Sequence, residues 1–293
     1  MAERLYGAIE AGGTKFVLGV GSEAGSIATR TVPTSDPDST LAEVEAFFAE
    51  QPRIDALGIA SFGPLQLDRA VPGYGRIMST TKPGWSGFDM VSRLASALSV
   101  PVGIDTDVNA AAVAEALAAG IGDLAYVTVG TGIGVGVVTN DGAVHGLSHP
   151  EGGHMYPRRH PAHAEFAGVC PFHHDCLEGL ASGPAILGAW GGTLSQLPPG
   201  HVAFEVEAEY LAQLCASLFM LLAPKRIVLG GGVMQHLELF APIRAKTLTL
   251  LNGYLSQVTE ATIDGLIVPP VSSEPPGLVG AYLLAASASA SAA

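Results

Sequence analysis

Two segments of the chain, one at the N-terminus and one near its middle, show the same order of features. In each, an apolar run typical of a β-strand leads into a turn rich in glycine and threonine, and a second apolar run follows. The first segment is Leu5–Val20, with its turn at Glu10–Lys15, and the second is Ala125–Thr139, with its turn at Gly130–Gly134. This repeat predicts an internal duplication, with two lobes that face a shared nucleotide.

The two turns have the composition of phosphate-binding loops. Consecutive glycines expose backbone N–H groups, and in the first turn the Thr14 hydroxyl and the Lys15 ammonium stand beside them. This turn lacks the G-x4-G-K-[ST] pattern, and an ordinary hairpin turn would have the same glycine pair, so both interpretations stay open. The G-x-G of the second turn leads into a strand and not a helix, which argues against a dinucleotide-binding fold.

An acidic cluster follows a third predicted strand, Val100–Ile104. The segment Asp105–Asn109 comes next, and then an alanine-rich helix over residues 110–119. The carboxyl end of a strand is where α/β folds place catalytic groups. Either aspartate could instead be the N-cap of the helix. We expect one of them to be the cap, so a catalytic role is predicted for only one.

A cluster of cysteine and histidine predicts a metal site. Cys170, His173 and Cys176 have C-x2-H-x2-C spacing, and His154 lies sixteen residues upstream of Cys170. Thiolates and imidazoles are the ligands that a tetrahedral structural Zn²⁺ prefers, and four protein ligands leave no position for a catalytic water. His174 competes with His173 as a ligand, and the alternative to a metal site is a surface loop with incidental histidines.

Two glutamates flank this cluster. Glu151 precedes His154 by three residues, and Glu178 follows Cys176 by two. A metal bound by His154 and Cys176 would bring the two carboxylates together, where they could accept hydrogen bonds from the hydroxyls of a polyol or sugar. The alternative for each glutamate is a solvated surface charge.

Composition excludes several classes of protein. The net charge of −13 and the pI near 5.0 argue against a nucleic-acid or anionic-membrane partner. No apolar run reaches membrane-spanning length, and the N-terminus lacks the layout of a signal peptide. Three cysteines, two of them in the predicted metal site, favour a reducing cytoplasm, and Cys215 is expected to be a buried small hydrophobe.

Several further elements can be read from periodicity and turn residues. A buried strand at 226–229 ends at Gly230–Gly232, which would let a ligand or helix approach the backbone closely. Trp85 either lines a pocket or packs its own loop. The closing Ser-Ala repeat up to Ala293 is expected to fray. The other predicted elements are a strand at 56–60 and helices around 41–48 and at 88–98, 204–222 and 278–286.

Taken in order, these motifs resemble the ROK family of bacterial sugar kinases. The resemblance runs from Tyr6 to about Ala286 and rests on EAGGTK, TDVNAAA, GTGIG, E-x-x-H, the Cys/His cluster, C-x-E-x-x-x-S-G and LGGGV. EAGGTKF and GLSHPE look like the fructokinase branch. ROK members usually carry a C-x-C-G-x-x-G-C cluster, and His173 stands where a cysteine often stands, a variant that the fructokinase-like members share.

The resemblance implies an α/β, two-lobed ribonuclease-H-like (actin-like ATPase) fold with a duplicated sheet-and-helix core and a small zinc-stabilised segment. The N-terminal lobe would comprise residues 1–118 and the C-terminal helix at about 278–293. The C-terminal lobe would comprise residues 119–277, with the zinc segment at 149–183. The resemblance also suggests a homodimer.

The resemblance further implies roles for individual residues. Asp107 would be the catalytic base, and Asn109 belongs to the same motif and is assigned to the substrate site. Glu151, His154 and Glu178 would hold the sugar, and His154 would also bind zinc with Cys170, His173 and Cys176. The phosphate loops would be Gly12, Gly13, Thr14 and Lys15, and Gly130, Thr131 and Gly132; the adenosine would contact Gly230, Gly231 and Gly232.

The predicted reaction is phosphoryl transfer from ATP and Mg²⁺ to fructose, at its O6 hydroxyl. One alternative is a kinase for glucose, mannose or an N-acetylated sugar, which the same residues would fit. A second is a sugar-responsive regulator without catalysis, but those relatives carry a DNA-binding winged helix before the kinase-like part, and here the first strand begins by Leu5. A third is a zinc hydrolase, which would need an open position on the metal.

Overall fold

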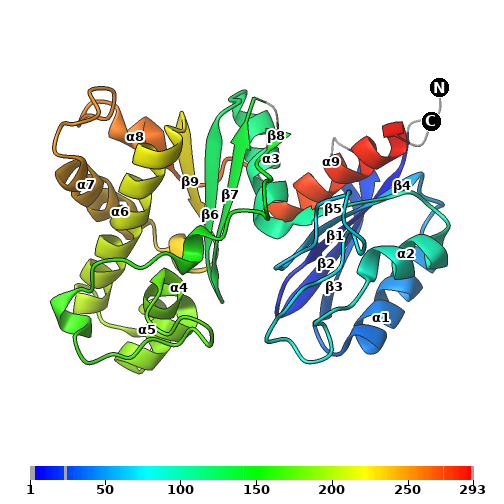
Figure 1. The fold of residues 1–293 in the computed structure, drawn as a ribbon, viewed down its shortest axis with the longest axis horizontal. Helices are drawn as coiled ribbons and strands as arrows, with labels where there is room; N and C mark the ends of the chain where they lie inside the picture. Colours follow the sequence, from blue (N-terminus) through cyan, green and yellow to red (C-terminus); the bar gives the residue numbers. More distant parts are fainter. Residues whose placement is uncertain (1–3, 23–24, 141, 273, 292–293) are drawn as a thin grey trace. The chain divides into compact units, whose positions relative to one another are not determined.

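The computed structural model describes residues 4–22, 25–140, 142–272 and 274–291. The chain forms two compact units (Figure 1). The first contains the residues up to Gly120, the segment that ends at Pro150 and the residues from Val271 onward. The second contains Ile121–Asn140 and Glu151–Pro270. Among the helices of the described ranges, none is both long enough and apolar enough to cross a membrane.

The first unit is built on a mixed sheet with the strand order β3-β2-β1-β4-β5. β1 and β2 form the predicted hairpin around the Gly12–Gly13 turn, and β4 and β5 run parallel to β1. The carboxyl ends of three strands therefore lie at one edge of the sheet. The strands are β1 (Tyr6–Ala11), β2 (Lys15–Ser22), β3 (Gly25–Pro33), β4 (Ala56–Ser61) and β5 (Val102–Thr106).

Helices cover both faces of this sheet. Side chains alternate along each strand, so β1 and β4 present Ile9 and Leu57 to one face and Ala8 and Ala60 to the other. The larger residues pack with α1 and α2, and the small ones receive α9, against which α3 also packs (Figure 1). The helices are α1 (Pro37–Ala49), α2 (Met90–Leu98), α3 (Asp107–Ala119) and α9 (Pro276–Ser291). The short strand β8 (Gly142–Ala143) lies in the segment that ends at Pro150, but it is hydrogen-bonded in the second sheet and not in this one.

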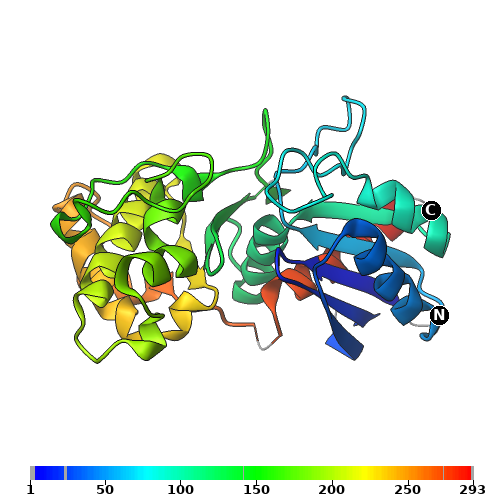
Figure 2. The same ribbon diagram turned by 90° about the horizontal axis from the view of Figure 1, so that it is seen from below.

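The long connection between β4 and α2 contains no helix and no named strand (Figure 2). Trp85 anchors it, because its side chain is fully buried and packs against the rings of Phe16 and Phe88. The indole Nε1–H also donates a hydrogen bond to the Ser35 carbonyl at 2.7 Å. Of the two roles considered for Trp85, the structure supports packing of its own loop.

Two predictions about helix ends are wrong. The cap of α3 is Thr106, whose hydroxyl accepts a hydrogen bond from the Asn109 N–H at 3.1 Å, so neither Asp105 nor Asp107 is the cap. The chain is still in β5 at Asp105, and it is already helical at Asp107. The Ser-Ala repeat continues α9 to Ser291. Alanine is the strongest helix former, and α9 buries its own Ala285 against the sheet. Residues 292–293 lie outside the described ranges.

Glycines in the sheet allow α9 to lie close to it. A Cβ atom at Gly58 would clash with the backbone carbonyl of Ala281, and one at Gly103 would meet the carbonyl of Leu284 at 2.5 Å. Both obstacles are backbone atoms, which cannot rotate away as a side chain could.

We therefore expect Gly58→Ala to destabilise the first unit by about 1–3 kcal/mol, the usual cost of overpacking. Thermal unfolding of Gly58→Ala, compared with a control variant, measures this effect. Gly265→Ala is the control, because a Cβ at Gly265, in helix α8 (Ile263–Leu266), would have no atom within 4 Å. An unchanged melting temperature for Gly58→Ala would contradict the close packing of α9.

The second unit repeats the topology of the first. β6 and β7 form an antiparallel hairpin, β9 runs parallel to β6, and β10 runs parallel to β9. The order β7-β6-β9-β10 and its directions match β2-β1-β4-β5, which confirms the duplication predicted from the two strand-turn-strand segments. These strands are β6 (Leu124–Val129), β7 (Ile133–Thr139), β9 (Arg226–Gly230) and β10 (Ile267–Val268).

Helix α6 (Val202–Leu222) is the longest helix of the second unit and lies beside α7 (Phe240–Leu251) in Figure 1 and Figure 2. Cys215 on α6 is fully buried, as predicted. The remaining helices are α4 (Leu177–Ala181), α5 (Gly183–Trp190) and α8 (Ile263–Leu266), with short 3₁₀ turns at Gly152–His154, Pro161–His163, Leu194–Gln196, Val233–Gln235 and Leu237–Leu239.

Candidate active site

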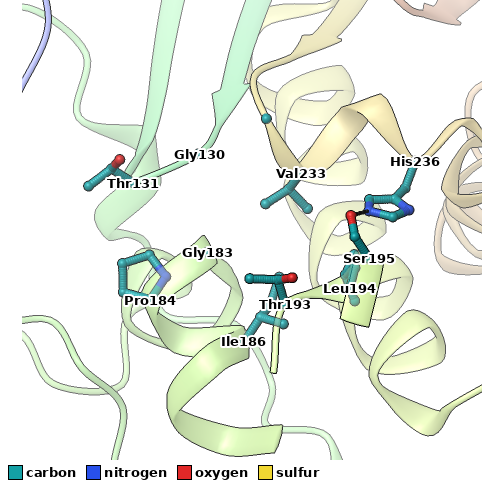
Figure 3. Close-up of a pocket in the computed structure, with 11 residues that line it drawn as sticks. Gly130, Thr131, Gly183, Pro184, Ile186, Thr193, Leu194, Ser195, Val233 and His236 are labelled. Carbon is teal, nitrogen blue, oxygen red and sulfur yellow. Dashed lines mark hydrogen bonds between the residues drawn. The ribbon is translucent and has the colours of Figure 1, made fainter. Parts of the chain in front are cut away.

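A cavity of about 380 Å³ lies in the second unit (Figure 3). Three structural elements meet at it: the turn between β6 and β7, the N-terminus of α5 and the residues that follow β9. It contains three residues that the resemblance assigned to the nucleotide, Gly130, Thr131 and Gly232. The lining residues are Gly130, Thr131, Gly183, Pro184, Ile186, Thr193, Leu194, Ser195, Gly232, Val233 and His236.

Two hydrogen bonds fix the start of α5 beside the Gly130–Gly132 turn. Ser182 caps the helix by accepting a hydrogen bond from the Ala185 N–H, and the Gly183 N–H donates to the Gly130 carbonyl at 2.8 Å. The N-terminus of a helix carries a partial positive charge and unpaired N–H groups, which favour a bound anion. A phosphate beside Thr131 would therefore meet both the turn and the helix dipole.

The three glycines after β9 have different structural roles. Gly231 has a φ of +91°, and a Cβ there would clash with the Val129 carbonyl, so this position requires glycine. Gly230 packs against the Tyr126 ring and does not line the cavity. Gly232 lines the cavity, has an ordinary helical φ of −63°, and would place a Cβ in open space.

A larger residue at Gly232 should narrow the cavity without straining the backbone. We expect Gly232→Val to raise the KM for ATP by at least about tenfold, with little change in melting temperature. Steady-state kinetics with varied ATP measure this, and Gly265→Val is the control because that glycine also has open space around it but lies outside the cavity. An unchanged KM for ATP would exclude this cavity as the nucleotide site.

The opposite wall of the cavity could not be read from the sequence. Ser195 Oγ lies 3.0 Å from His236 Nε2 (Figure 3). On its other side, His236 Nδ1 lies 3.2 Å from Glu238 Oε1. Ser195 and His236 are 41 residues apart and belong to no motif, so only the tertiary structure identifies them.

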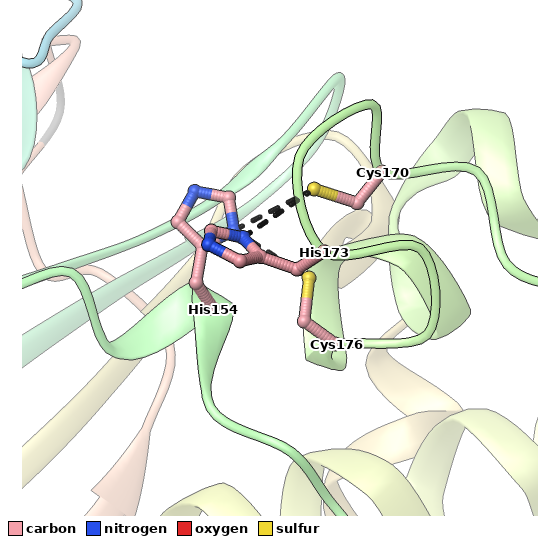
Figure 4. Close-up of side chains that lie close together, drawn as sticks. All are labelled: His154, Cys170, His173 and Cys176. Carbon is pink, nitrogen blue, oxygen red and sulfur yellow. Dashed lines mark hydrogen bonds between the residues drawn. The ribbon is translucent and has the colours of Figure 1, made fainter.

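The Cys/His cluster has the geometry of a four-ligand metal site (Figure 4). One ligand atom from each of His154, Cys170, His173 and Cys176 lies within 4.8 Å of all the others. His154 Nδ1 is 3.5 Å from Cys176 Sγ and 3.8 Å from Cys170 Sγ. Tetrahedral Zn²⁺ with ordinary Zn–N and Zn–S bonds would separate N and S ligands by about 3.6 Å.

The backbone decides between the two adjacent histidines. His174 has a left-handed φ of 53°, and its backbone pairs with Cys170 in both directions, which closes the loop between the two cysteines. This loop brings the His173 ring into the cluster, with Nδ1 3.8 Å from Cys170 Sγ. His174 is outside the group of ligand atoms.

The cluster is linked directly to the predicted sugar-binding glutamates. Cys176 is the N-cap residue of α4, and Glu178 lies in the first turn of that helix. One oxygen of Glu178, Oε2, accepts a hydrogen bond from the Ile133 N–H at 3.0 Å, next to the Gly130–Gly132 turn. Burial, and to a lesser extent the charge of Glu178, raises the pKa of Glu151 to about 7.

In the first unit, the β1–β2 turn is braced from two sides. The Thr34 hydroxyl donates to the Gly12 carbonyl at 2.7 Å, and the Gly12 N–H donates to the Lys15 carbonyl at 3.0 Å. The Lys82 side chain crosses the turn, because a Cβ at Gly13 would lie 3.2 Å from Lys82 Nζ. Lys82 thus places its ammonium group at this turn, whereas sequence reasoning identified only Lys15, the first residue of β2.

Asp107 and Asn109 lie in the first turn of α3. Asp107 is the first helical residue, and its Oδ1 accepts a hydrogen bond from the Val108 N–H at 2.9 Å. Asn109 is fully buried, and its Nδ2 donates to Asp105 Oδ1 at 2.9 Å. The sequence left open whether Asp105 is a helix cap or a catalytic group. In the structure, its buried carboxylate accepts the hydrogen bond of Asn109.

The predicted site residues therefore divide between the two units. The Gly12–Lys15 turn, Asp107 and Asn109 belong to the first unit, whereas the cavity, the two glutamates and the Cys/His cluster belong to the second. The chain is therefore an α/β protein of two units. Their sheets share one topology, each sheet has a glycine-rich turn between its first two strands, and a cavity lies at the turn of the second unit.

Comparison with known proteins identifies the family. The ROK family model matches residues 6–288, so the chain belongs to the ROK family. A putative fructokinase from Bacillus subtilis is 43% identical over 287 residues, covering 96% of this chain and 95% of that protein. A fructokinase from Zymomonas mobilis is 42% identical over 297 residues, covering 98% of both chains.

A solved structure agrees with this assignment. The ROK hexokinase of Thermus thermophilus superposes with a TM-score of 0.75 at 25% sequence identity, covering 96% of this chain and 98% of that chain. The chain therefore has the actin-like α/β fold of the ROK sugar kinases, with two mixed sheets.

Proposed function

We propose that the protein is an ATP-dependent fructokinase that converts D-fructose to fructose 6-phosphate. The observation that carries this proposal is the similarity to fructokinases at 42–43% identity over nearly the whole length of both chains. The cavity in the second unit supports it, because glycine-turn amides and the N-terminus of α5 provide a site for the phosphates of a nucleotide.

The proposed reaction demands little covalent chemistry from the protein. Phosphoryl transfer needs in-line positioning, stabilisation of phosphate charge and a group that accepts the hydroxyl proton. We assign the last role to the Asp107 carboxylate. Backbone N–H groups at Gly12–Lys15 and Gly130–Gly132, with the ammonium groups of Lys15 and Lys82, would hold the phosphates. Bound Mg²⁺ would supply further charge neutralisation.

For the sugar, we propose that Glu151, His154, Glu178 and Asn109 bind hydroxyl groups. Because Glu178 uses Oε2 for the Ile133 N–H, its Oε1 is the oxygen assigned to the sugar. With a pKa of about 7, the Glu151 carboxyl exchanges between a donor and an acceptor near neutral pH, so it can serve either end of a hydroxyl.

We propose that the Cys/His cluster binds a structural Zn²⁺. The two sulfur and two nitrogen ligand atoms are the donor set that tetrahedral Zn²⁺ prefers, they lie within 4.8 Å of one another, and they would fill all four positions. The metal would fix the start of α4 and, through it, Glu178. Its thiolate ligands fit a reducing cytoplasm, where we place the protein. We also propose a homodimer, for which the exposed Leu221 at the end of α6 is a candidate contact.

A coupled ADP-release assay with ATP and Mg²⁺ tests the function. Zinc-loaded protein is compared on fructose, glucose, mannose and N-acetylglucosamine, and we expect kcat/KM to be highest for fructose by about tenfold or more. Equal or faster turnover of another hexose would keep the kinase and overturn the fructose assignment. No ADP release above the sugar-free rate with any of the four would overturn the kinase assignment and favour a non-catalytic sugar-responsive regulator.

A further inference from the structure

Asp105 is a buried carboxylate at the junction of β5 and α3. Only 6% of the surface of Asp105 is exposed, and both carboxylate oxygens have hydrogen-bonding partners. Oδ1 accepts from the Thr106 N–H at 2.7 Å and from Asn109 Nδ2 at 2.9 Å. Oδ2 lies 3.0 Å from His145 Nε2. Among the described residues, His145 is the only basic side chain paired with Asp105.

This arrangement fixes the amide orientation of Asn109. A carboxylate can only accept hydrogen bonds, so the Asn109 nitrogen must face Asp105. The amide oxygen Oδ1 then points the other way, and it is buried without a hydrogen-bond partner among the described residues. A buried acceptor without a partner is costly, typically about 1–3 kcal/mol, unless a ligand or water satisfies it. Loss of the carboxylate charge would remove the reason for this orientation.

His145 reaches Asp105 from a distant part of the chain. It lies in the segment that follows β8, between α3 and the motif that contains Glu151. Four residues later, His149 is 7% exposed, and its Nε2 accepts a hydrogen bond from the Leu65 N–H at 3.0 Å. The segment is thus fastened at two points, to the end of β5 by His145 and to the loop after β4 by His149.

We propose that His145 is a positioning residue for phosphoryl transfer: as an imidazolium paired with Asp105, it holds the first turn of α3, and with it Asp107 and Asn109, in the reactive orientation. The inference rests on the proposed function, because Asp107 and Asn109 matter only if the protein transfers a phosphoryl group to a sugar. His145 itself is not assigned a contact with substrate.

The charge of this pair depends on pH. The hydrogen bond to Asp105 raises the pKa of His145, the charge of Asp105 adds to the effect, and partial burial opposes it. A histidine with a raised pKa contributes its full stabilisation below the unfolded value of about 6.5 and loses it as the pH rises through the folded value. The charged pair should therefore be fully formed below about pH 6.5 and be lost as the pH rises through the raised pKa of His145.

The other titratable groups around the pair do not change charge in this range. Burial lowers the pKa of His149, so it stays neutral as the acceptor for Leu65. Burial also raises the pKa of Tyr74, whose hydroxyl lies 3.4 Å from the Ile104 carbonyl, while Arg69 beside it opposes the shift. His145 is thus the group of this network whose charge we expect to change as the pH rises above about 6.5.

The first test observes His145 directly and needs no substrate. The imidazole resonances of the full-length protein are followed by NMR across pH, with His145→Gln used to assign them. We expect a pKa above about 6.5 for His145, and a return towards that value in Asp105→Asn. A His145 pKa at or below the ordinary value in the wild type would overturn the proposal, whatever the enzyme does.

The second test is kinetic. His145→Gln keeps an N–H donor towards Asp105 but removes the charge and its titration. We expect its kcat at neutral pH to fall by about tenfold or more, with a much smaller change in the KM for ATP. The wild type should lose activity on the alkaline side as His145 deprotonates, and this part of the decline should be absent in the variant. Any change caused by Glu151, whose pKa is about 7, should be the same in both proteins.

Glu50→Gln is the matched control, because it removes an ion pair of the same unit, with Arg30, that is exposed and far from Asp105 in the sheet. Its kcat and pH profile should equal those of the wild type. Wild-type turnover of fructose establishes the proposed function separately. If fructose is phosphorylated and His145→Gln keeps the wild-type alkaline decline, the positioning role is overturned while the fructokinase assignment stands. A lowered melting temperature with an unchanged pH profile would equally overturn it, in favour of a purely structural role.

Discussion

Replacing Asp107 with asparagine should lower kcat for fructose by about 10²–10⁴-fold, the usual contribution of a general base. Asparagine has nearly the same shape, and its amide oxygen can still accept the hydrogen bond that Asp107 Oδ1 accepts from the Val108 N–H. It cannot take the proton of the sugar hydroxyl. Steady-state kinetics should therefore show a large loss of kcat, while the KM for ATP and the melting temperature change little.

Asp89→Asn is the matched control for this variant. Asp89 is also at the N-terminus of a helix of the first unit, where its side chain caps α2 by accepting from the Ser92 N–H. Asparagine caps helices as well as aspartate does, so both stability and kcat should be preserved. If Asp107→Asn retained activity comparable to that of Asp89→Asn, Asp107 would not be the base.

Removing the metal should produce the second large effect. If the free Zn²⁺ concentration is about 1,000 times the Kd of the site, binding stabilises the folded state by about 4 kcal/mol. With an unfolding entropy of about 2.1 cal/mol/K per residue, this chain of 293 residues should lose about 7 °C in melting temperature when a chelator removes the metal. The KM for fructose should rise at the same time. The metal ligand Cys176 is the N-cap residue of α4, and Glu178, which we assign to the sugar, lies in the first turn of that helix.

Adjacent histidines provide a matched pair for this prediction. His173→Asn should reduce the zinc content, measured by elemental analysis, from about one ion per chain towards zero, because a structural site needs all four ligands. His174→Asn should leave it unchanged, since asparagine tolerates the left-handed φ of 53° and this ring is outside the cluster. Equal zinc loss in both variants would contradict the assignment of His173.

Cys215→Ala provides a second control, because Cys215 is buried in α6 outside the cluster. It should lower stability through the lost packing and leave the zinc content unchanged. Zinc that survives in Cys176→Ala but is lost in Cys215→Ala would exclude the cluster as the metal site.

Features encoded by neighbouring residues could be predicted from the sequence. The two strand-turn-strand segments predicted the duplication, because alternating apolar residues and paired glycines specify a hairpin within fewer than twenty residues. The spacing of Cys170, His173 and Cys176 predicted three members of the cluster for the same reason. The C-terminal helix was found, but its end was misjudged, because the alanines that looked like low-complexity sequence are strong helix formers.

The tertiary structure decided the features that depend on contacts between distant residues. Thr106, and not an aspartate, caps α3, because Asp105 remains in the strand and turns its carboxylate towards His145 and Asn109. Likewise, Lys82 reaches the first glycine turn from a loop anchored by Trp85. No local pattern encodes these partners. A buried charge is costly unless it is paired and hydrogen-bonded. Which residue pairs with it depends on how distant parts of the chain pack together and not on sequence spacing.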